Sequence, residues 1–378
     1  MARTKQEHLD RTKSPKRILA LDGGGIRGIL TLGYLGEIEA LLRERTGNKT
    51  MVLAEYFDLI GGTSTGSIIA AALACGMSVK DLNDLYRRLG NSVFESKFYR
   101  KGLFVPKFPS EPVREALEHN LGKDTTLDSD RIHTGLMIMA KRLDTGSPWP
   151  LHNHPDARYA KQDGALLLSQ VVRASTAAPT YFEPEAITIA SRDGKEVQGA
   201  FVDGGVSPFN DPALQMLMLA ALHGHGFRWQ TGKDKLLLIS VGTGTYRATS
   251  TTEDLLGMAP ALQGVKALQS LMDDCARLNH GMLQWLTNCL TPWKIDRAVE
   301  DMQQDSKAGP QLATYARYNV LLEPTWLKTN VEIEKGPDQL AKIAEMDNPK
   351  NMEELAEIGR IAAKKQVKAE HFPGGFDL

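Results

Sequence analysis

The sequence lacks the features of a secreted or membrane-spanning protein. Its 3 cysteines in 378 residues are an odd, widely spaced set, which argues against a disulfide framework. The longest apolar runs, near 68–75 and 216–222, are too short to cross a bilayer. Residues 1–17 are polar and mostly basic, without the apolar segment of a secretory signal. We therefore expect a cytoplasmic protein.

Neither sign of charge is in excess. The 45 Lys and Arg residues balance 46 Asp and Glu residues, whereas a dedicated nucleic-acid binder usually shows a strong basic excess. We expect no nucleic-acid partner. Metal-ligand patterns are also sparse, because His152-x-His154 near Asp156 is a short polar loop and a weak ligand set. We expect no metal and no cofactor.

Apolar segments and helical patterns alternate along the first two thirds of the chain. Short apolar runs predict buried strands at 17–21, 57–60, 135–143, 197–202 and 235–241. Helical spacing predicts helices between them, at 26–47, 64–74, 165–174 and 211–222. Strands that alternate with helices predict an α/β fold with a largely parallel sheet.

The pattern divides the chain into three parts. We expect a flexible basic arm over 1–15 and a catalytic domain over 16–245. Residues 246–378 have mainly helical patterns, and Asn351-x-x-Glu354 resembles a capping box. We expect this last part to be a helical extension packed on the catalytic core.

The strongest chemical signal is the pentapeptide Gly62-Thr63-Ser64-Thr65-Gly66. It lies between an apolar strand and an Ala-rich helix, where a G-x-S-x-G motif turns sharply and lifts a serine hydroxyl out of a sheet. The positive end of the helix favours negative charge nearby. The alternative is that Ser64 only caps the helix. The context favours Ser64 as a nucleophile.

A second signal is the glycine-rich loop Asp22–Gly28, with glycines at 23, 24 and 25. Such a loop before a helix exposes backbone N–H groups that can hold an oxyanion or a phosphate. It also satisfies the dinucleotide pattern G-x-G-x-x-G, but the next strand ends in the serine turn instead of an acidic residue. An oxyanion hole is favoured. Arg27 either helps to bind an anionic lipid head group or shapes the loop, and the alternative is a solvated arginine on the first helical turn.

The third signal is Asp203-Gly204-Gly205, at the end of a predicted strand. Functional groups of α/β proteins collect at strand ends. An Asp-Gly pair is by itself more often a simple turn. Only its combination with the other two motifs indicates a catalytic carboxylate.

In order, DGGGIRG, GTSTG and DGG resemble the motifs of the patatin-like phospholipases. The block ASTAAPTYF at 174–182 is similar to a segment before the aspartate in that family, and the likeness extends over about 16–244. It implies a patatin-like three-layer fold with a largely parallel central sheet. It also implies a phospholipid substrate, cleaved at a carboxylic ester through an acyl-enzyme.

Carried over position by position, the resemblance implies a catalytic dyad of Ser64 and Asp203. Its oxyanion loop matches Gly23, Gly24, Gly25 and Arg27, and the motifs are completed by Gly28, Gly62, Gly66, Gly204 and Gly205. A carboxylate is a weak base, so the dyad requires Asp203 to be partly desolvated. The helical part after 245 carries no motif to transfer.

Other functions remain open at this point. A Ser-Asp-His esterase is one, since His223, His225 and His280 follow Asp203 in the required order. A lipid- or nucleotide-binding sensor that has kept the fold is another. Some bacterial patatin-like enzymes are anti-phage effectors switched on by cyclic nucleotides, and a nucleotide activator is a possible partner that this resemblance implies. The sequence has no nucleotide motif other than the weak G-x-G-x-x-G match of the glycine loop.

A segment between 90 and 110 is a candidate for membrane contact. Aromatic and basic residues alternate there, as suits an anionic lipid interface: Phe94, Lys97, Phe98, Lys101 and Phe104. The alternative is a loop with packed aromatics and solvated lysines. This alternation of aromatic and basic residues predicts that the protein associates peripherally with membranes when it is active.

Overall fold

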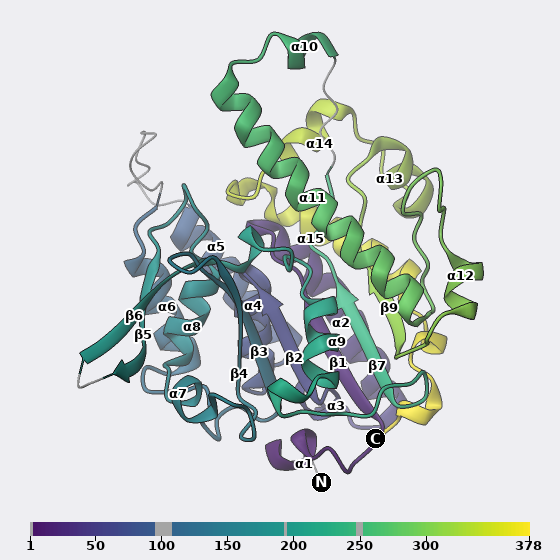
Figure 1. Ribbon diagram of the computed structural model, residues 1–378. Helices are drawn as coiled ribbons and strands as arrows, with labels where there is room; N and C mark the ends of the chain where they lie inside the picture. The colour runs from purple at the N-terminus through teal and green to yellow at the C-terminus, as the bar shows by residue number, and fades with distance from the viewer. Residues whose placement is uncertain (1–2, 95–107, 193–194, 247–251) are drawn as a thin grey trace.

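A mixed nine-stranded sheet forms the centre of the molecule, with helices on both faces (Figure 1). The computed structural model describes residues 3–94, 108–192, 195–246 and 252–378. The strand order is β5-β6-β3-β2-β1-β7-β9-β8, and β4 pairs with β3. The strands are β1 Lys16–Leu21, β2 Leu59–Thr63, β3 Gly135–Arg142, β4 Ser147–His152, β5 Glu185–Arg192, β6 Lys195–Asp203, β7 Leu236–Val241, β8 Asn288–Cys289 and β9 Thr314–Tyr318.

The six strands from β3 to β8 in this order run parallel, as the alternating pattern predicts. The antiparallel part is at one side, where β6 pairs with β3 and β5 pairs with β6. The sequence did not predict β4, β5, β8 or β9. It also placed β2 too early, because Gly62 and Thr63 belong to the strand instead of the turn.

The two faces of the sheet bury alternate residues of the same strands. In β1, Leu19 and Leu21 join the larger core, which includes α2, α4, α8 and α15. Ile18 and Ala20 face the smaller core, which includes α9. The helices are α1 Lys5–Leu9, α2 Gly28–Thr46, α3 Leu53–Tyr56, α4 Thr65–Ala74, α5 Val79–Phe94, α6 Glu111–Leu121, α7 Ala160–Gly164, α8 Leu168–Ser175, α9 Ala213–Ala221, α10 Thr252–Leu256, α11 Pro260–Leu286, α12 Gln303–Ala308, α13 Pro324–Val331, α14 Pro337–Ile343 and α15 Met352–Gln366.

The start of the chain differs from the expected flexible arm. It forms the helix α1, with His8 and Leu9 buried. The buried carboxylate of Asp58 accepts hydrogen bonds from Arg3 at 2.5 Å and from the backbone N–H of Arg17 at 2.8 Å, and it lies 3.0 Å from His8 Nδ1. The basic side chains that suggested a solvated arm therefore have a buried partner that is distant in sequence.

The region after 245 is also more than a helical extension. It contributes β8 and β9 to the central sheet, where β9 pairs with β7. Its last helix, α15, packs against α2, and Gly33 of α2 approaches Gly359 so closely that a Cβ would lie 2.6 Å from the Gly359 carbonyl carbon. The expected boundary at 245 therefore falls inside one continuous sheet.

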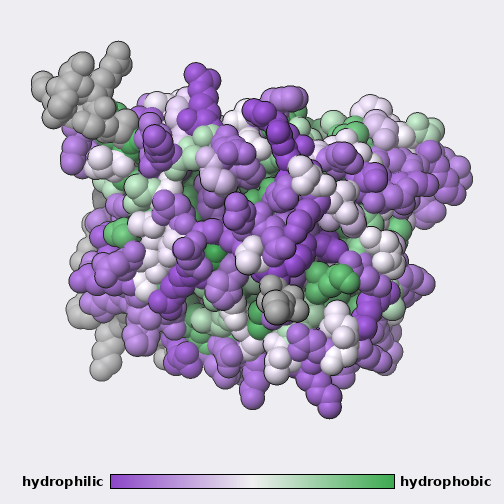
Figure 2. All heavy atoms as spheres, turned by 90° about the horizontal axis from the view of Figure 1, so that it is seen from below, coloured by the Kyte–Doolittle hydropathy of each residue, from purple (hydrophilic) through white to green (hydrophobic). Residues whose placement is uncertain are grey.

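No helix among the described residues is long and apolar enough to span a bilayer. The face seen from below is mostly hydrophilic, with apolar groups in small separate areas (Figure 2). In the segment proposed for membrane contact, Lys97, Phe98, Lys101 and Phe104 lie outside the described residues, and α5 ends at Phe94, whose side chain is not described. Its interfacial role stays a prediction.

Candidate functional site

Ser64 occupies a strained turn between β2 and α4. Its backbone has φ 53° and ψ −126°, a conformation that is unfavourable for a residue with a side chain. The flanking glycines are required because a Cβ on Gly62 would lie 2.1 Å from the carbonyl oxygen of Gly66, and one on Gly66 would lie 2.4 Å from that of Leu21. The Ser64 side chain makes no capping hydrogen bond to α4, so helix capping does not explain it.

The hydroxyl of Ser64 instead donates to Asp203, with 2.5 Å between Oγ and Oδ2. Sheet register explains this proximity. Thr63 pairs with Met139 in β3, and the next residue of β3, Ala140, pairs with Asp203 in β6. Although β6 runs antiparallel to β3, its last residue therefore reaches the level of the serine turn.

The carboxylate of Asp203 is buried and only 5% exposed. Its second oxygen, Oδ1, accepts a hydrogen bond from the N–H of Gly205 at 2.7 Å. Burial raises the pKa of Asp203 from 3.8 to about 6, although the hydrogen bonds from Ser64 and Gly205 oppose this rise. The raised pKa makes the carboxylate a stronger base than a solvated aspartate.

Ser175 and Ala177 hold the serine and the aspartate in place, and the sequence assigned no role to either. The Ser175 hydroxyl accepts from the N–H of Ser64 at 2.9 Å and donates to the Met139 carbonyl at 2.6 Å. The carbonyl of Ala177 accepts from the N–H of Asp203 at 3.0 Å. Both residues belong to the block ASTAAPTYF, for which the sequence showed only a resemblance. The structure gives the physical reason for this block, because two of its residues contact Ser64 and Asp203.

The glycine loop lies beside this pair. A Cβ on Gly23 would lie 3.0 Å from Cβ of Ser64, and one on Gly24 would lie 2.1 Å from Oγ1 of Thr243. Gly25 has φ +57°, which favours glycine. The N–H of Gly23 donates to Asn210 at 3.1 Å, whereas within the described chain the N–H groups of Gly24 and Gly25 have no hydrogen-bond acceptor. Of the three glycines, Gly24 and Gly25 can therefore bind an oxyanion.

Arg27 follows the loop in the short 3-10 helix Gly25–Arg27. Its Nε is buried without a hydrogen-bond partner among the described residues. Burial lowers the pKa of Arg27 to about 10, against the opposing effects of Asp273 and Asp22. The guanidinium therefore remains charged at neutral pH and can interact with an anionic group.

The three histidines of the alternative triad lie elsewhere. His223 and His225 are in the short helix His223–His225, beyond the far end of α9. His280 is in α11, where Nε2 lies 3.1 Å from Gln284 and Nδ1 lies 3.4 Å from the hydroxyl of Tyr315. Among the described residues, none of the three forms a hydrogen bond with Ser64 or Asp203.

The loop of His152 and His154 forms part of a buried aromatic cluster. The ring of His152 lies 5.7 Å from that of His225, and the ring of His154 lies 4.4 Å from that of Phe227. Burial lowers the pKa of His152 to about 3, which keeps it neutral. Within the part of the chain that the structure describes, no group of three or more His, Cys, Asp or Glu side chains could hold a metal ion.

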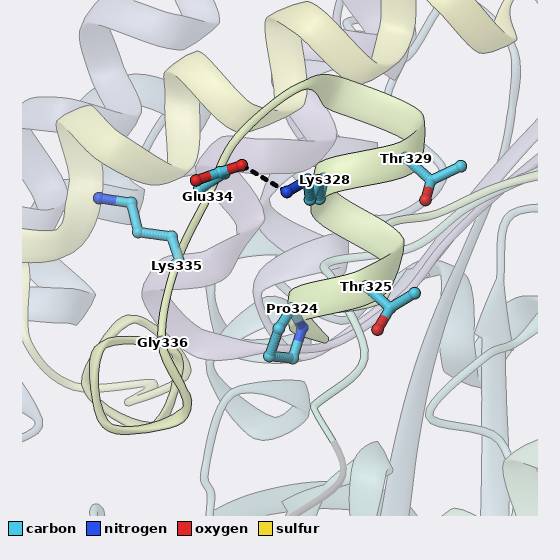
Figure 3. Close-up of a pocket in the computed structure, with 7 residues that line it drawn as sticks. All are labelled: Pro324, Thr325, Lys328, Thr329, Glu334, Lys335 and Gly336. Carbon is cyan, nitrogen blue, oxygen red and sulfur yellow. Dashed lines mark ion pairs between the residues drawn. The ribbon is translucent and has the colours of Figure 1, made fainter.

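An open pocket lies away from the motifs, between α13 and the loop that leads to α14 (Figure 3). It is lined by Pro324, Thr325, Lys328, Thr329, Glu334, Lys335 and Gly336. Lys328 and Glu334 form an ion pair of 2.7 Å across it. None of these residues belongs to the segments that carry Ser64, Asp203 or the glycine loop.

Comparisons with known proteins found similar chains both in sequence and among solved structures. A cGAMP-activated phospholipase of Escherichia coli (strain TW11681) is 34% identical over 207 residues, which cover 53% of this chain and 55% of that protein. Patatin-15 of Solanum tuberosum is 30% identical over 272 residues, 67% of each chain. A structure of human GIVD cytosolic phospholipase A2 matches 97% of this chain and 61% of that one, at 12% identity and a TM-score of 0.44.

The bacterial match spans only about half of the relative's length. The family profile described as patatin-like phospholipase matches residues 19–217, which is more than half of this chain and includes Ser64, Asp203 and the glycine loop. The chain therefore belongs to the patatin-like phospholipase family.

Proposed function

We propose that this protein is a lipid acyl hydrolase of the phospholipase A type, with Ser64 as nucleophile and Asp203 as general base. The observation that carries the proposal is the 2.5 Å hydrogen bond between Ser64 Oγ and Asp203 Oδ2 at a strained strand-to-helix turn. Family membership supports the substrate class, a carboxylic ester of a phospholipid.

The chemistry proceeds in two halves. Ser64 Oγ attacks the ester carbonyl carbon while its proton passes to Asp203, and the negative charge that forms on the carbonyl oxygen is held by the N–H groups of Gly24 and Gly25. The intermediate collapses, and Asp203 returns the proton to the departing alcohol. Water then attacks the acyl-enzyme while it gives a proton to Asp203. The second intermediate collapses, the fatty acid leaves, and Asp203 returns the proton to Ser64 Oγ, which restores the free enzyme.

The direct test is hydrolysis of phospholipid vesicles and of a small soluble ester by the purified protein. Release of fatty acid and lysophospholipid is expected, together with covalent labelling of Ser64 by a fluorophosphonate. If the folded protein gives no product and no label, both without and with cyclic dinucleotides, the hydrolase is refuted and the lipid-binding sensor is favoured.

We further propose that a cyclic nucleotide activates the protein. The support is that two bacterial relatives, at 34% and 32% identity, are cGAMP-activated phospholipases by name. The test compares turnover of the same phospholipid with and without cGAMP, and includes other cyclic dinucleotides. An increase of at least about 10-fold, worth about 1.4 kcal/mol of coupling, supports activation. Equal turnover with every nucleotide contradicts it.

Peripheral binding to lipid is a third part of the proposal, supported by α10 and α11. α10 and the first part of α11 project beyond the edge of the sheet to which β1 and β2 lead, whereas the rest of α11 runs alongside the sheet (Figure 1). Asn279 of α11 donates a hydrogen bond to the carbonyl of Pro208, whose neighbour Phe209 accepts one from Thr63. The exposed side chains of α10 and α11 include Leu256 at 81%, Leu262 at 61% and Leu271 at 59%. Apolar groups exposed on elements that project from the protein suit a membrane surface.

A further inference from the structure

We propose that Arg317 is a positioning residue, which holds the glycine loop in register with Ser64 and Asp203. Arg317 lies in β9, outside both the expected catalytic domain and the family match at 19–217. The effect on turnover rests on the proposed function, whereas the effect on the loop itself can be measured without any substrate.

The first contact is a two-point ion pair with Asp22, the residue before Gly23. Nη1 of Arg317 donates to Oδ1 at 2.9 Å, and Nη2 donates to Oδ2 at 2.5 Å. A planar guanidinium with two parallel hydrogen bonds fixes the orientation of the carboxylate as well as its distance. The start of the glycine loop is thereby tied to β9.

The second contact reaches the segment that follows Asp203. Nη1 of Arg317 lies 2.9 Å from Oδ2 of Asp211, without hydrogen-bond geometry, and it donates to Ser240 at 2.5 Å. The neighbouring residue, Asn210, accepts from the N–H of Gly23 at 3.1 Å and donates from Nδ2 to the Gly23 carbonyl at 3.3 Å. Arg317 therefore tethers both segments that border the site.

Burial distinguishes this group from an ordinary ion pair. Arg317 is 8% exposed, Asp22 is 6% and Asp211 is 2%. Burying one cation with two carboxylates costs desolvation energy, so such a group adds little to stability compared with apolar packing. What it supplies is a fixed geometry. Arg317 stays charged because the two carboxylates raise its pKa well above the usual value, against the effect of burial.

The geometry matters because Gly24 and Gly25 are proposed to bind charge that exists only in the transition state. A loop displaced by about 1 Å can cost about 100-fold in rate. Such a loss appears in kcat and leaves KM nearly unchanged, since the substrate binds before the charge forms.

The test uses Arg317→Lys, which keeps the charge but cannot make the two-point contact, and Arg317→Met. The control is Arg360→Met, which removes an exposed arginine of α15 that pairs with Glu357. Hydrogen exchange of the full chain is compared over 22–28 and over 207–211. Faster exchange confined to these segments in the Lys variant supports the tether, and wild-type protection in both would overturn it.

Kinetics on a soluble ester complete the test. Arg317→Lys should lower kcat at least about 10-fold with KM within about 2-fold, while Arg360→Met keeps both. Wild-type kcat in the Lys variant overturns the positioning role. If Arg317→Met does not fold, Asp211→Asn serves as the second variant, with a smaller loss of kcat expected. If the wild-type protein lacks activity, the proposed function fails, and the exchange measurement still decides whether the tether exists.

Discussion

At the scale of single residues, Ser64 and Asp203 are the pair on which the proposed chemistry depends. Ser64→Ala removes the nucleophile while the strained turn is still formed by its glycines. Ester hydrolysis should fall on the order of 10³-fold or more with thermal stability retained. Substantial turnover by the purified variant would refute Ser64 as the nucleophile.

The raised pKa of Asp203 predicts the pH dependence of turnover. The carboxylate must be ionised to accept the serine proton, so turnover should rise with pH through about 6 and then level off. A pH series on a soluble ester measures this, with intrinsic fluorescence to confirm folding at each pH. A midpoint near 4 would mean that Asp203 is not desolvated in solution.

The same burial predicts that Asp203→Asn is inactive but more stable at high pH. A folded-state pKa of about 6 against 3.8 means that the native state holds its proton more tightly, so stability from this group falls as pH rises from about 4 to above 6. The raised pKa corresponds to a loss of about 3 kcal/mol in the free energy of unfolding of the wild-type protein at pH 8. The gain of the Asn variant is smaller than this, because the variant loses charge-assisted hydrogen bonds. The test compares the melting temperatures of the variant and the wild-type protein at pH 8 and at pH 5. We expect the variant to melt higher only at pH 8, and an equal decrease at both pH values would contradict the prediction.

The alternative triad is tested at the same scale. His223, His225 and His280, each changed to Gln, should keep most of the turnover, because none of them forms a hydrogen bond with the dyad among the described residues. Loss of turnover in one of these variants, with the fold intact, would establish a Ser-His-Asp mechanism.

At the scale of elements, the glycine loop depends on Gly25 and its left-handed backbone. Gly25→Ala would place a Cβ 2.3 Å from the Met346 carbonyl at φ +57°. The loop must shift, and kcat should fall on the order of 100-fold with little change in KM. Gly47→Ala is a matched control, since Gly47 has φ +67° and nothing within 4 Å of its added Cβ.

The result also separates two functions of this loop. A pure rise in KM would indicate a loop that binds a substrate phosphate in the ground state. A saturable thermal shift of the wild-type protein with NAD would instead support the dinucleotide pattern.

At the scale of the whole molecule, α10 and α11 should govern action on membranes. Leu256→Ser with Leu262→Ser removes two exposed apolar side chains and should weaken vesicle binding, while soluble-ester turnover stays within about 2-fold. Leu222→Ser is the control, because this residue is 53% exposed at the far end of α9. Equal vesicle binding by all three proteins, measured by co-sedimentation, would contradict the proposal.

The sequence by itself determined the parts of the site that are local. The turn around Ser64 follows from the two glycines beside it, because only they tolerate the close approach of the backbone at 62 and 66. The parallel strands β1 and β7 follow from continuous apolar runs, since strands buried on both faces carry no polar alternation.

Tertiary structure decided everything that depends on register or on distant partners. The distance between Ser64 and Asp203 comes from the pairing of β2, β3 and β6, which local patterns do not encode. Arg317 has no motif around it, and its role depends on a carboxylate 295 positions earlier. The sequence predicted that Arg3 and His8 belong to a flexible basic arm, because their buried partner, Asp58, lies far along the chain. A charge is recognised as buried only when its surroundings are known, and the fold alone supplies them.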